Sequence, residues 1–267
     1  MVRTFLLSDI DNMTLRNELE YFFGAIRFFT RLPVPRWVGH SSEALGRSSR
    51  YFPAVGLIVG GIAALTFALA MLVWPKTLAV LAAMAITLYI TGAFHEDGWS
   101  DMVDGFGGGW EKAQILKIMK DSRIGSFGAV ALVMMLLTKF CALVEIDAAL
   151  IVFSLIAGHT LSRLCATLVM DRLDYVRDEG KAKPLATSIS RGSLAFATFT
   201  ALLALLPLLF VLPVRQTLAG IALAGLATLW LARMFRKQIG GYTGDCLGAT
   251  QQLSEVAFYC GLLCKFS

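Results

Sequence analysis

PAVGLIVGGIAALTFALAMLVW, residues 53–74, contains no charged side chain. A helix of about 20 apolar residues is long enough to cross the hydrocarbon core of a bilayer. Because lipid offers the backbone no hydrogen-bond partner, a segment of this kind satisfies its own backbone groups by forming a helix. The stretch therefore predicts a helix that spans a membrane.

The same composition recurs along the chain. Hydrophobic residues make up 57% of the sequence and charged residues only 16%, against roughly 25% charged residues in an ordinary soluble domain. Six stretches are long and apolar enough to span, and a seventh is shorter and weaker: 53–74, 77–94, 125–146, 149–170, 194–212, 217–235 and, as the weaker one, 253–266. We therefore predict an all-α integral membrane protein with about six to seven transmembrane helices in one bundle.

The N-terminal part has a different character. Residues 21–32 (YFFGAIRFFTRL) are aromatic and basic but too few to span, which predicts a helix lying in the membrane interface. Residues 1–20 are interpreted as an N-terminal extension. No internal repeat or low-complexity linker divides the rest, so residues 21–267 are predicted to form a single integral membrane domain.

Lys and Arg residues are concentrated in alternate connections between the predicted spans. One side holds only Lys76 and Arg215, whereas nineteen basic residues lie in the segments of the other side: 1–51, 95–124, 171–193 and 233–237. Basic connections remain in the cytoplasm during membrane insertion. The N-terminus and all four basic segments are therefore predicted to be cytoplasmic.

HEDGWSDMVDG, residues 95–105, places four carboxylates at the end of the second predicted span: Glu96, Asp97, Asp101 and Asp104. If the segment continues that helix, Asp97, Asp101 and Asp104 share one face at spacings of four and three residues. Like charges at this spacing destabilise an isolated helix, so a cation is expected to offset them. Mg²⁺ prefers carboxylate oxygens and shares its remaining positions with substrate phosphates. The alternative is a solvated acidic loop that caps a membrane helix.

Basic and hydroxyl side chains follow in MKDSRIGSFG, residues 119–128. Lys120, Ser122 and Arg123 are predicted to bind a phosphate group, since Arg binds phosphate through two nitrogens and Lys acts as a point charge. The alternative is that these cations only anchor the adjacent span on the cytoplasmic side.

Two further candidates lie inside a predicted span. His159 and Arg163 are four residues apart and so face one side of their helix. Because unpaired cations are costly in hydrocarbon, they are expected to face the bundle interior, together with Lys139, and to meet acid or phosphate there. For His159, a hydrogen bond to a neighbouring helix is the alternative to binding substrate.

A glycine-rich turn in QIGGYTGD, residues 238–245, precedes the last helical stretch. Such a turn can present backbone N–H groups to an anion, which makes Gly240, Gly241 and Thr243 candidates for binding substrate. Asp245 adds a further acid on the cytoplasmic side, and its alternative role is that of a helix N-cap.

Five motifs together carry a family resemblance: FHEDGWSDMVDGFGGG (94–109), IMKDSRIGSFG (118–128), GGYTGDCLGA (240–249), FFTRLPVP (28–35) and YFPAVGLIVGG (51–61). The first three, in this order and between apolar spans, resemble the cobalamin synthase family, the adenosylcobinamide-GDP ribazoletransferases, and the last two resemble that family's N-terminal pattern. The resemblance covers nearly the whole chain. The departures are small: Trp99 and Ser100 stand where the family usually has Leu and Ala.

The resemblance implies a Mg²⁺-dependent enzyme of the bacterial cytoplasmic (inner) membrane, with its active site facing the cytoplasm. It would join adenosylcobinamide-GDP to α-ribazole or α-ribazole 5′-phosphate, giving adenosylcobalamin or its 5′-phosphate and GMP. The expected metal ligands are Glu96, Asp97, Asp101 and Asp104. The expected catalytic residues are Asp97, Asp101, Lys120 and Arg123, with Asp97 or Asp245 as the general base. No nucleic-acid partner is expected, and the sequence leaves a homo-oligomer open.

Two other functions compete with this interpretation. A CDP-alcohol phosphotransferase also uses an Asp-rich face on a membrane helix, although the Ala-Arg that normally follows its first Asp-Gly pair is missing from DGWSD. A cation-coupled transporter would need acids near the bilayer midplane and broken helices in matching halves. The acids here lie at the end of a span, and no repeat is visible.

Overall fold

The computed structural model describes residues 2–39, 41–178, 180, 182–183 and 189–266, with side chains from residue 15 onward. These residues form helices joined by short turns and by two longer connections, between α1 and α2 and between α8 and α9, and the described part contains no strand beyond one isolated bridge. The elements are α1 (Val2–Phe29), α2 (Ser42–Arg47), the 3-10 helix η1 (Ser48–Tyr51), α3 (Phe52–Ala70), α4 (Lys76–Thr91), α5 (Phe94–Gly108), α6 (Lys112–Ile118), α7 (Ser126–Glu145), α8 (Ala148–Arg172), α9 (Arg191–Val211), α10 (Val214–Ile239) and α11 (Gly244–Leu262).

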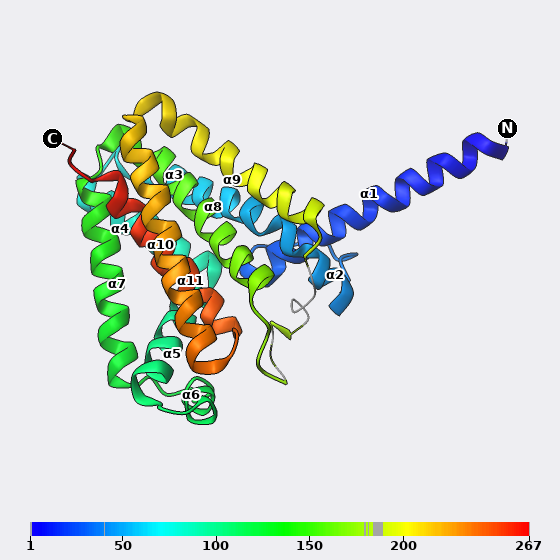
Figure 1. Ribbon diagram of the computed structural model, residues 1–267. Coiled ribbons are helices and arrows are strands. Elements are labelled where there is room, and N and C mark those ends of the chain that lie inside the picture. The colour runs from blue at the N-terminus through cyan, green and yellow to red at the C-terminus, as the bar shows by residue number, and fades with distance from the viewer. Residues whose placement is uncertain (1, 40, 179, 181, 184–188, 267) are drawn as a thin grey trace.

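The bundle confirms the prediction of an all-α multi-pass membrane protein (Figure 1). Within the described residues, five helical segments are long and apolar enough to cross a membrane: Ser42–Ala70, Ser126–Glu145, Ala148–Arg172, Arg191–Val211 and Val214–Ile239. A sixth span is reached only if α4 and α5 are counted together, although they meet at an 85° bend. The seventh predicted span, 253–266, falls in α11, which carries too many polar residues to join this set.

The first helix is longer than the sequence predicted. The predicted interfacial segment 21–32 lies at the C-terminal end of α1, which begins at Val2 and so includes most of the predicted extension. Figure 1 shows α1 projecting from the bundle, with only its C-terminal part against α2 and α3. The boundary predicted at residue 20 therefore falls within a continuous helix.

Small residues bring the central helices into close contact. A side chain on Gly60 of α3 would place its Cβ 2.7 Å from the Cα of Ile156 on α8, and one on Gly261 of α11 would lie 2.5 Å from the Cα of Gly220 on α10. Glycine at such positions allows helix backbones to approach closely, which is how helices associate in lipid. These contacts pack α3 on α8 and α10 on α11, and a third glycine, Gly158 of α8, lies against the ring of Tyr259 on α11.

The acidic segment is helical as predicted, but it does not continue the preceding span. Gly92 adopts a left-handed conformation with φ of 65° and Ala93 follows with φ of 54°. Two consecutive left-handed residues end α4, because an α-helix requires negative φ throughout. Helix α5 therefore leaves at 85° and packs against α11, α7 and α6 at one end of the molecule (Figure 1).

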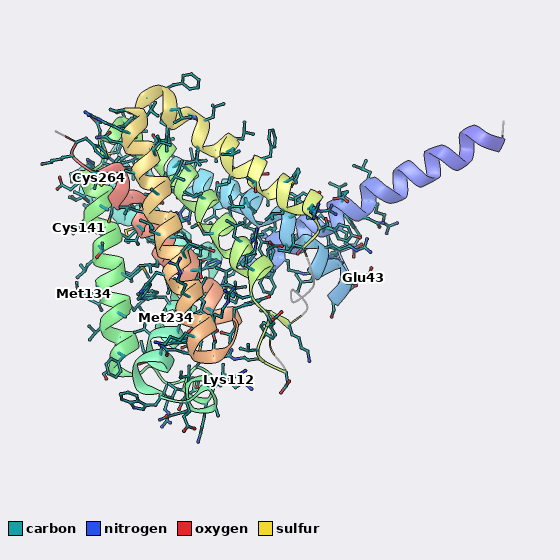
Figure 2. All side chains as sticks on the ribbon, in the orientation of Figure 1. Glu43, Lys112, Met134, Cys141, Met234 and Cys264 are labelled. Atoms are coloured by element: carbon teal, nitrogen blue, oxygen red, sulfur yellow. The ribbon has the colours of Figure 1, made fainter. Side chains whose placement is uncertain are left out.

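Apolar side chains cover the outer surface of the bundle. On α7, Val130, Val133, Met134 and Leu137 are all exposed, and Figure 2 shows Met134 and Cys141 directed away from the other helices. An apolar surface of this extent is typical of contact with lipid. Lys112 marks the end at which α5 and α6 lie, and Cys264 lies toward the other end (Figure 2).

Candidate active site

Three carboxylates gather where α5 meets the first turn of α11. Asp97 and Asp101 lie one turn apart on α5, and Asp245 enters from α11; we call these three residues the acid cluster. Burial, followed by the charges of Asp97 and Asp245, raises the pKa of Asp101 to about 7. Because the three charges act on one another, the cluster will attract a cation.

Glycines make this meeting of helices possible. A Cβ on Gly98 would lie 3.1 Å from the Cα of Asp245 and 3.3 Å from the Cα of Gly248. The spacing is already as tight as a real Cβ contact permits, so a larger side chain would separate α5 from α11. Gly98 therefore sets the distance between the two halves of the acid cluster.

Thr243, and not Asp245, is the N-cap of α11. Its Oγ1 accepts a hydrogen bond from the backbone N–H of Cys246 at 3.3 Å. This arrangement leaves the Asp245 carboxylate free for another partner, which is Arg177: its Nη2 lies 2.8 Å from Asp245 Oδ2. Burial raises the pKa of Asp245, while Arg177 acts in the opposite direction.

A short backbone pairing places Arg177 in the site. The N–H of Val176 donates to the carbonyl oxygen of Tyr242 at 3.0 Å, and the N–H of Tyr242 donates to that of Asp174 at 2.8 Å. Gly240, with φ of 79°, ends α10 just before this pairing, and Gly241 packs on the backbone of Asp174. The predicted glycine turn thus positions a neighbouring segment through its backbone.

The other two predicted metal ligands have protein partners. Asp104 is buried and accepts hydrogen bonds from the backbone N–H groups of Gly125 at 2.7 Å and Gly128 at 2.8 Å, at the start of α7. Glu96 is buried and its Oε1 accepts a hydrogen bond from Nε2 of Gln252 at 2.7 Å. Asp97 and Asp101 therefore lie with Asp245, whereas Glu96 and Asp104 accept hydrogen bonds from protein donors, although the charge of Asp104 also acts on Asp101.

The predicted phosphate-binding loop lies at the same end of the molecule. Arg123 has 86% of its side chain exposed, and its Nη2 pairs with Asp121 Oδ2 at 2.7 Å. The hydrogen bonds from Arg123 lower the pKa of Asp121 to about 2. Ser122 is exposed as well. Of the three predicted residues, Lys120 lines an open cleft of about 530 Å³ between α6 and the segment 176–178; we call it the α6 cleft.

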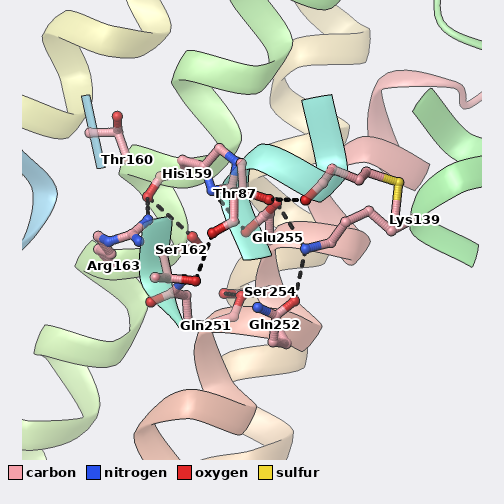
Figure 3. Close-up of polar contacts among 12 residues, drawn as sticks. Thr87, Lys139, His159, Thr160, Ser162, Arg163, Gln251, Gln252, Ser254 and Glu255 are labelled. Atoms are coloured by element: carbon pink, nitrogen blue, oxygen red, sulfur yellow. Dashed lines mark hydrogen bonds and ion pairs between the residues drawn. The ribbon is translucent and has the colours of Figure 1, made fainter. Parts of the chain in front are cut away.

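His159 and Arg163 belong to a buried network between α7, α8 and α11 (Figure 3). Glu255 lies 3.1 Å from Lys139 Nζ and 3.2 Å from His159 Nδ1, and Lys139 also donates to Gln252 at 2.8 Å. Arg163 is 1% exposed and donates to the carbonyl oxygen of His159. Lys139 and His159 meet an acid, Glu255, as expected, whereas the hydrogen bond of Arg163 goes to a backbone carbonyl and its Nε and Nη2 are buried without a partner among the described residues. His159 contacts a neighbouring helix, as in its structural alternative. A substrate-binding role for His159 and Arg163 stays a prediction.

The residues that the sequence did not single out are Arg177, Gln252 and Glu255. Arg177 was counted only as one of several cations in a basic connection. Glu255 and Gln252 lie in the weak seventh stretch, and their partners Lys139 and Glu96 are more than a hundred residues away. The sequence signal that could have identified Gln252 and Glu255 is the presence of polar side chains in an otherwise apolar helix.

No group of three or more His, Cys, Asp or Glu side chains is arranged to hold a metal ion among the residues that the structure describes. Mg²⁺ does not need such a group, because it commonly binds one or two carboxylates and completes its octahedron with water and substrate phosphates. Asp97 is exposed and Asp101 is half-buried, one helical turn apart. Their oxygen donors and their position fit Mg²⁺.

Comparison with known proteins identifies related chains. The family model described as cobalamin-5-phosphate synthase matches residues 21–263. Proteins named adenosylcobinamide-GDP ribazoletransferase are similar over nearly the full length. The one from Shewanella frigidimarina is 47% identical, with 92% of this chain and 95% of that protein covered. The one from Leptothrix cholodnii is 44% identical, with 93% and 97% covered. No solved structure matches the chain.

Proposed function

Because the chain belongs to the cobalamin-5-phosphate synthase family, we propose that it carries out the transfer for which its relatives are named, joining adenosylcobinamide-GDP to α-ribazole or its 5′-phosphate with release of GMP. The observation that carries this proposal is the acid cluster beside Arg177 and the α6 cleft. Carboxylates for a dication and cations for phosphate are the groups that a phosphoryl transfer requires.

Asp97 and Asp101 would hold Mg²⁺ against the diphosphate of the activated corrinoid. The bound ion would neutralise the phosphate charge and orient the leaving group. Asp104 and Glu96 would position the helices that carry this site. Asp104 accepts hydrogen bonds from the start of α7, and Glu96 links α5 to α11 through Gln252. In this scheme two of the four acids would bind the metal ion, and the other two would hold the helices around it in place.

In the proposed step, a hydroxyl oxygen of the ribazole ribose forms a bond to the phosphorus that stays with the corrinoid. The bond from this phosphorus to the oxygen of GMP breaks, and GMP leaves with the electron pair. The hydroxyl proton passes to the carboxylate of Asp245, which its raised pKa favours as the acceptor. Arg177 and Lys120 would neutralise charge on the transferred phosphoryl group and on GMP.

Arg177 takes the place in this scheme that the sequence suggested for Arg123. Arg177 lies 2.8 Å from a member of the acid cluster, whereas Arg123 is turned to solvent and to Asp121. We further propose that this end of the bundle faces the cytoplasm of a bacterial inner membrane. The excess of Lys and Arg in the connections at this end supports that orientation.

The test is turnover by the full chain reconstituted in liposomes with Mg²⁺. Adenosylcobinamide-GDP is supplied with α-ribazole or with its 5′-phosphate, and the corrinoid product and GMP are separated by chromatography. Stoichiometric release of both is expected, and chelation of Mg²⁺ should stop it. CDP-diacylglycerol with an alcohol acceptor serves as the comparison; release of CMP in that reaction, without corrinoid transfer, would overturn the proposal.

A further inference from the structure

The α6 cleft contains more charge than phosphate binding alone requires. Its charged lining consists of Lys117 and Lys120 from the α6 side and of Arg177 and Asp178 from the facing segment. Its volume of about 530 Å³ lies within the range of sites that hold small ligands. The three cations indicate an anionic ligand, and the single acid needs a separate explanation.

The cleft is continuous with the acid cluster through one side chain. Arg177 lines the cleft, and its Nη2 lies 2.8 Å from Asp245 Oδ2. A diphosphate held at Asp97 and Asp101 would therefore lie next to Arg177, with its far end directed into the cleft. Lys117 and Lys120 would then meet the phosphate that departs, since Lys binds phosphate as a point charge.

Asp178 is suited to read the base of a nucleotide in this cleft. A carboxylate is an acceptor with two oxygens. Guanine presents two adjacent donors, N1–H and the 2-amino group, which one carboxylate can accept together. Adenine has no donor at N1, and hypoxanthine lacks the 2-amino group. The leaving nucleotide of the proposed reaction carries guanine, so an exposed acid beside three cations matches both ends of that ligand.

We propose that the α6 cleft is the guanosine monophosphate subsite, in which Lys117, Lys120 and Arg177 bind the phosphate and Asp178 binds the Watson–Crick edge of guanine. This inference rests on the proposed function and adds to it the residue that selects GDP over other activating groups.

The experiment measures nucleotide binding to the detergent-solubilised full chain by calorimetry in the presence of Mg²⁺. The wild-type protein should bind GMP more tightly than IMP, and IMP more tightly than AMP. The total difference should be roughly tenfold or more, because hydrogen bonds to a charged group are at stake. Equal affinity for GMP and AMP would overturn the inference.

The variant Asp178→Asn gives a sharper test, because it should gain a preference for xanthine over guanine. Xanthine has a carbonyl oxygen where guanine has its 2-amino group, and an Asn amide can donate to that oxygen while accepting from N1–H. Asp178→Asn should therefore bind XMP more tightly than GMP, the reverse of the wild-type order. Asp174→Asn is the matched control: it removes the same charge from an exposed residue that does not line the cleft, and it should keep the wild-type order.

A second pair of variants tests the phosphate end. Lys117→Ala should weaken the binding of GMP, IMP and AMP by the same factor, roughly tenfold, because in this proposal the Lys117 side chain contacts the phosphate and no base. Lys112→Ala, on the same helix but outside the cleft, should leave all three unchanged. A base-dependent loss in Lys117→Ala would contradict the assignment.

Corrinoid transfer by the wild-type protein is measured in parallel, so that failure of the proposed function can be told from failure of the guanosine subsite. Absence of turnover would contradict the proposed function. Turnover that continues while Asp178→Asn retains the guanine preference would remove only the guanosine subsite.

Discussion

Asp97 and Asp104 stand seven residues apart on α5, yet their surroundings give them different tasks. Asp97 is exposed, and its carboxylate faces solvent beside Asp101. Asp104 is buried, and both of its oxygens accept backbone N–H groups at the start of α7. A carboxylate used in this way has little capacity left for a metal ion. Substitutions of the two residues should therefore fail in different ways.

Asp97→Ala should lower the rate of corrinoid transfer by roughly 100-fold or more, as removal of a group that stabilises the transition state does. Its melting temperature should stay near that of the wild type, since Asp97 is exposed and, although it lies in the first turn of α5, no side chain in the described part of the chain caps that helix end through a hydrogen bond. Both quantities are measured on the purified variant. Asp171→Ala, which removes a carboxylate paired only with its neighbour Arg172, is the control. Near-normal turnover by Asp97→Ala would disprove the metal-binding role.

The variants Arg177→Ala and Arg123→Ala should also differ clearly in their rates of corrinoid transfer. Arg177 contacts the acid cluster, so its loss should reduce transfer by roughly 100-fold. Arg123 is exposed, and ion pairs of that kind contribute about 0–1 kcal/mol. Arg123→Ala should therefore keep transfer within about threefold of the wild-type rate. Steady-state rates at saturating substrate decide the matter, and a larger loss in Arg123→Ala than in Arg177→Ala would reverse the assignment.

Sequence reasoning found Asp97, Asp101 and Asp245 because acids are conspicuous in an apolar chain. It could not find Arg177, since a basic residue in a connection between predicted spans has a topological explanation of its own. The pairing of Val176 with Tyr242 that places Arg177 joins segments more than sixty residues apart. No local pattern in the sequence reports such a contact.

Within the contact between helices α5 and α7, one side chain, Asp104, binds the start of α7. The free N–H groups in the first turn of α7 need acceptors, and Asp104 provides two. The apolar spans could be predicted from composition, because length and hydropathy determine which segments enter lipid. The 85° bend between α4 and α5 could not, because Gly92 and Ala93 fit a continuing helix as well as a break.

Asp104→Ala should destabilise the protein by about 1–3 kcal/mol, because it leaves two buried backbone donors without a partner. The melting temperature should fall, and any loss of activity should follow the loss of folded protein. The affinity for Mg²⁺, measured on the fraction that remains folded, should be unchanged. Asp104→Ala protein with a normal melting temperature and no Mg²⁺ binding would show that Asp104 is a metal ligand after all.

The molecule as a whole is asymmetric between its two ends. Helix α6, the acid cluster and the glycine turn lie at one end, and the connection near Val73 lies at the other (Figure 1). The distribution of Lys and Arg predicted that these segments share one side of the membrane, and the cytoplasmic orientation of that side stays a prediction. The distances within each end depend on packing between helices that are remote in sequence, so they required the structure.

Vesicles of known orientation can test the topology. In a variant whose own cysteines are replaced, Ser122→Cys should react with a membrane-impermeant maleimide only when the cytoplasmic face is outward. Val73→Cys, also exposed, should react only in the opposite orientation. Labelling of Ser122→Cys from the periplasmic side would place the acid cluster on the wrong face for a cytoplasmic nucleotide.

The pairing of Lys139 with Glu255 has a consequence for biogenesis. The ribosome delivers α7 well before α11, so the Lys139 ammonium group enters the translocon before its counter-ion Glu255 has been made. Helix α11 in turn is too polar to partition on its own, and it gains a favourable environment only by docking on helices already in place. Docking of α11 also brings Asp245 to α5, so the three carboxylates come together only once this polar helix has found its place.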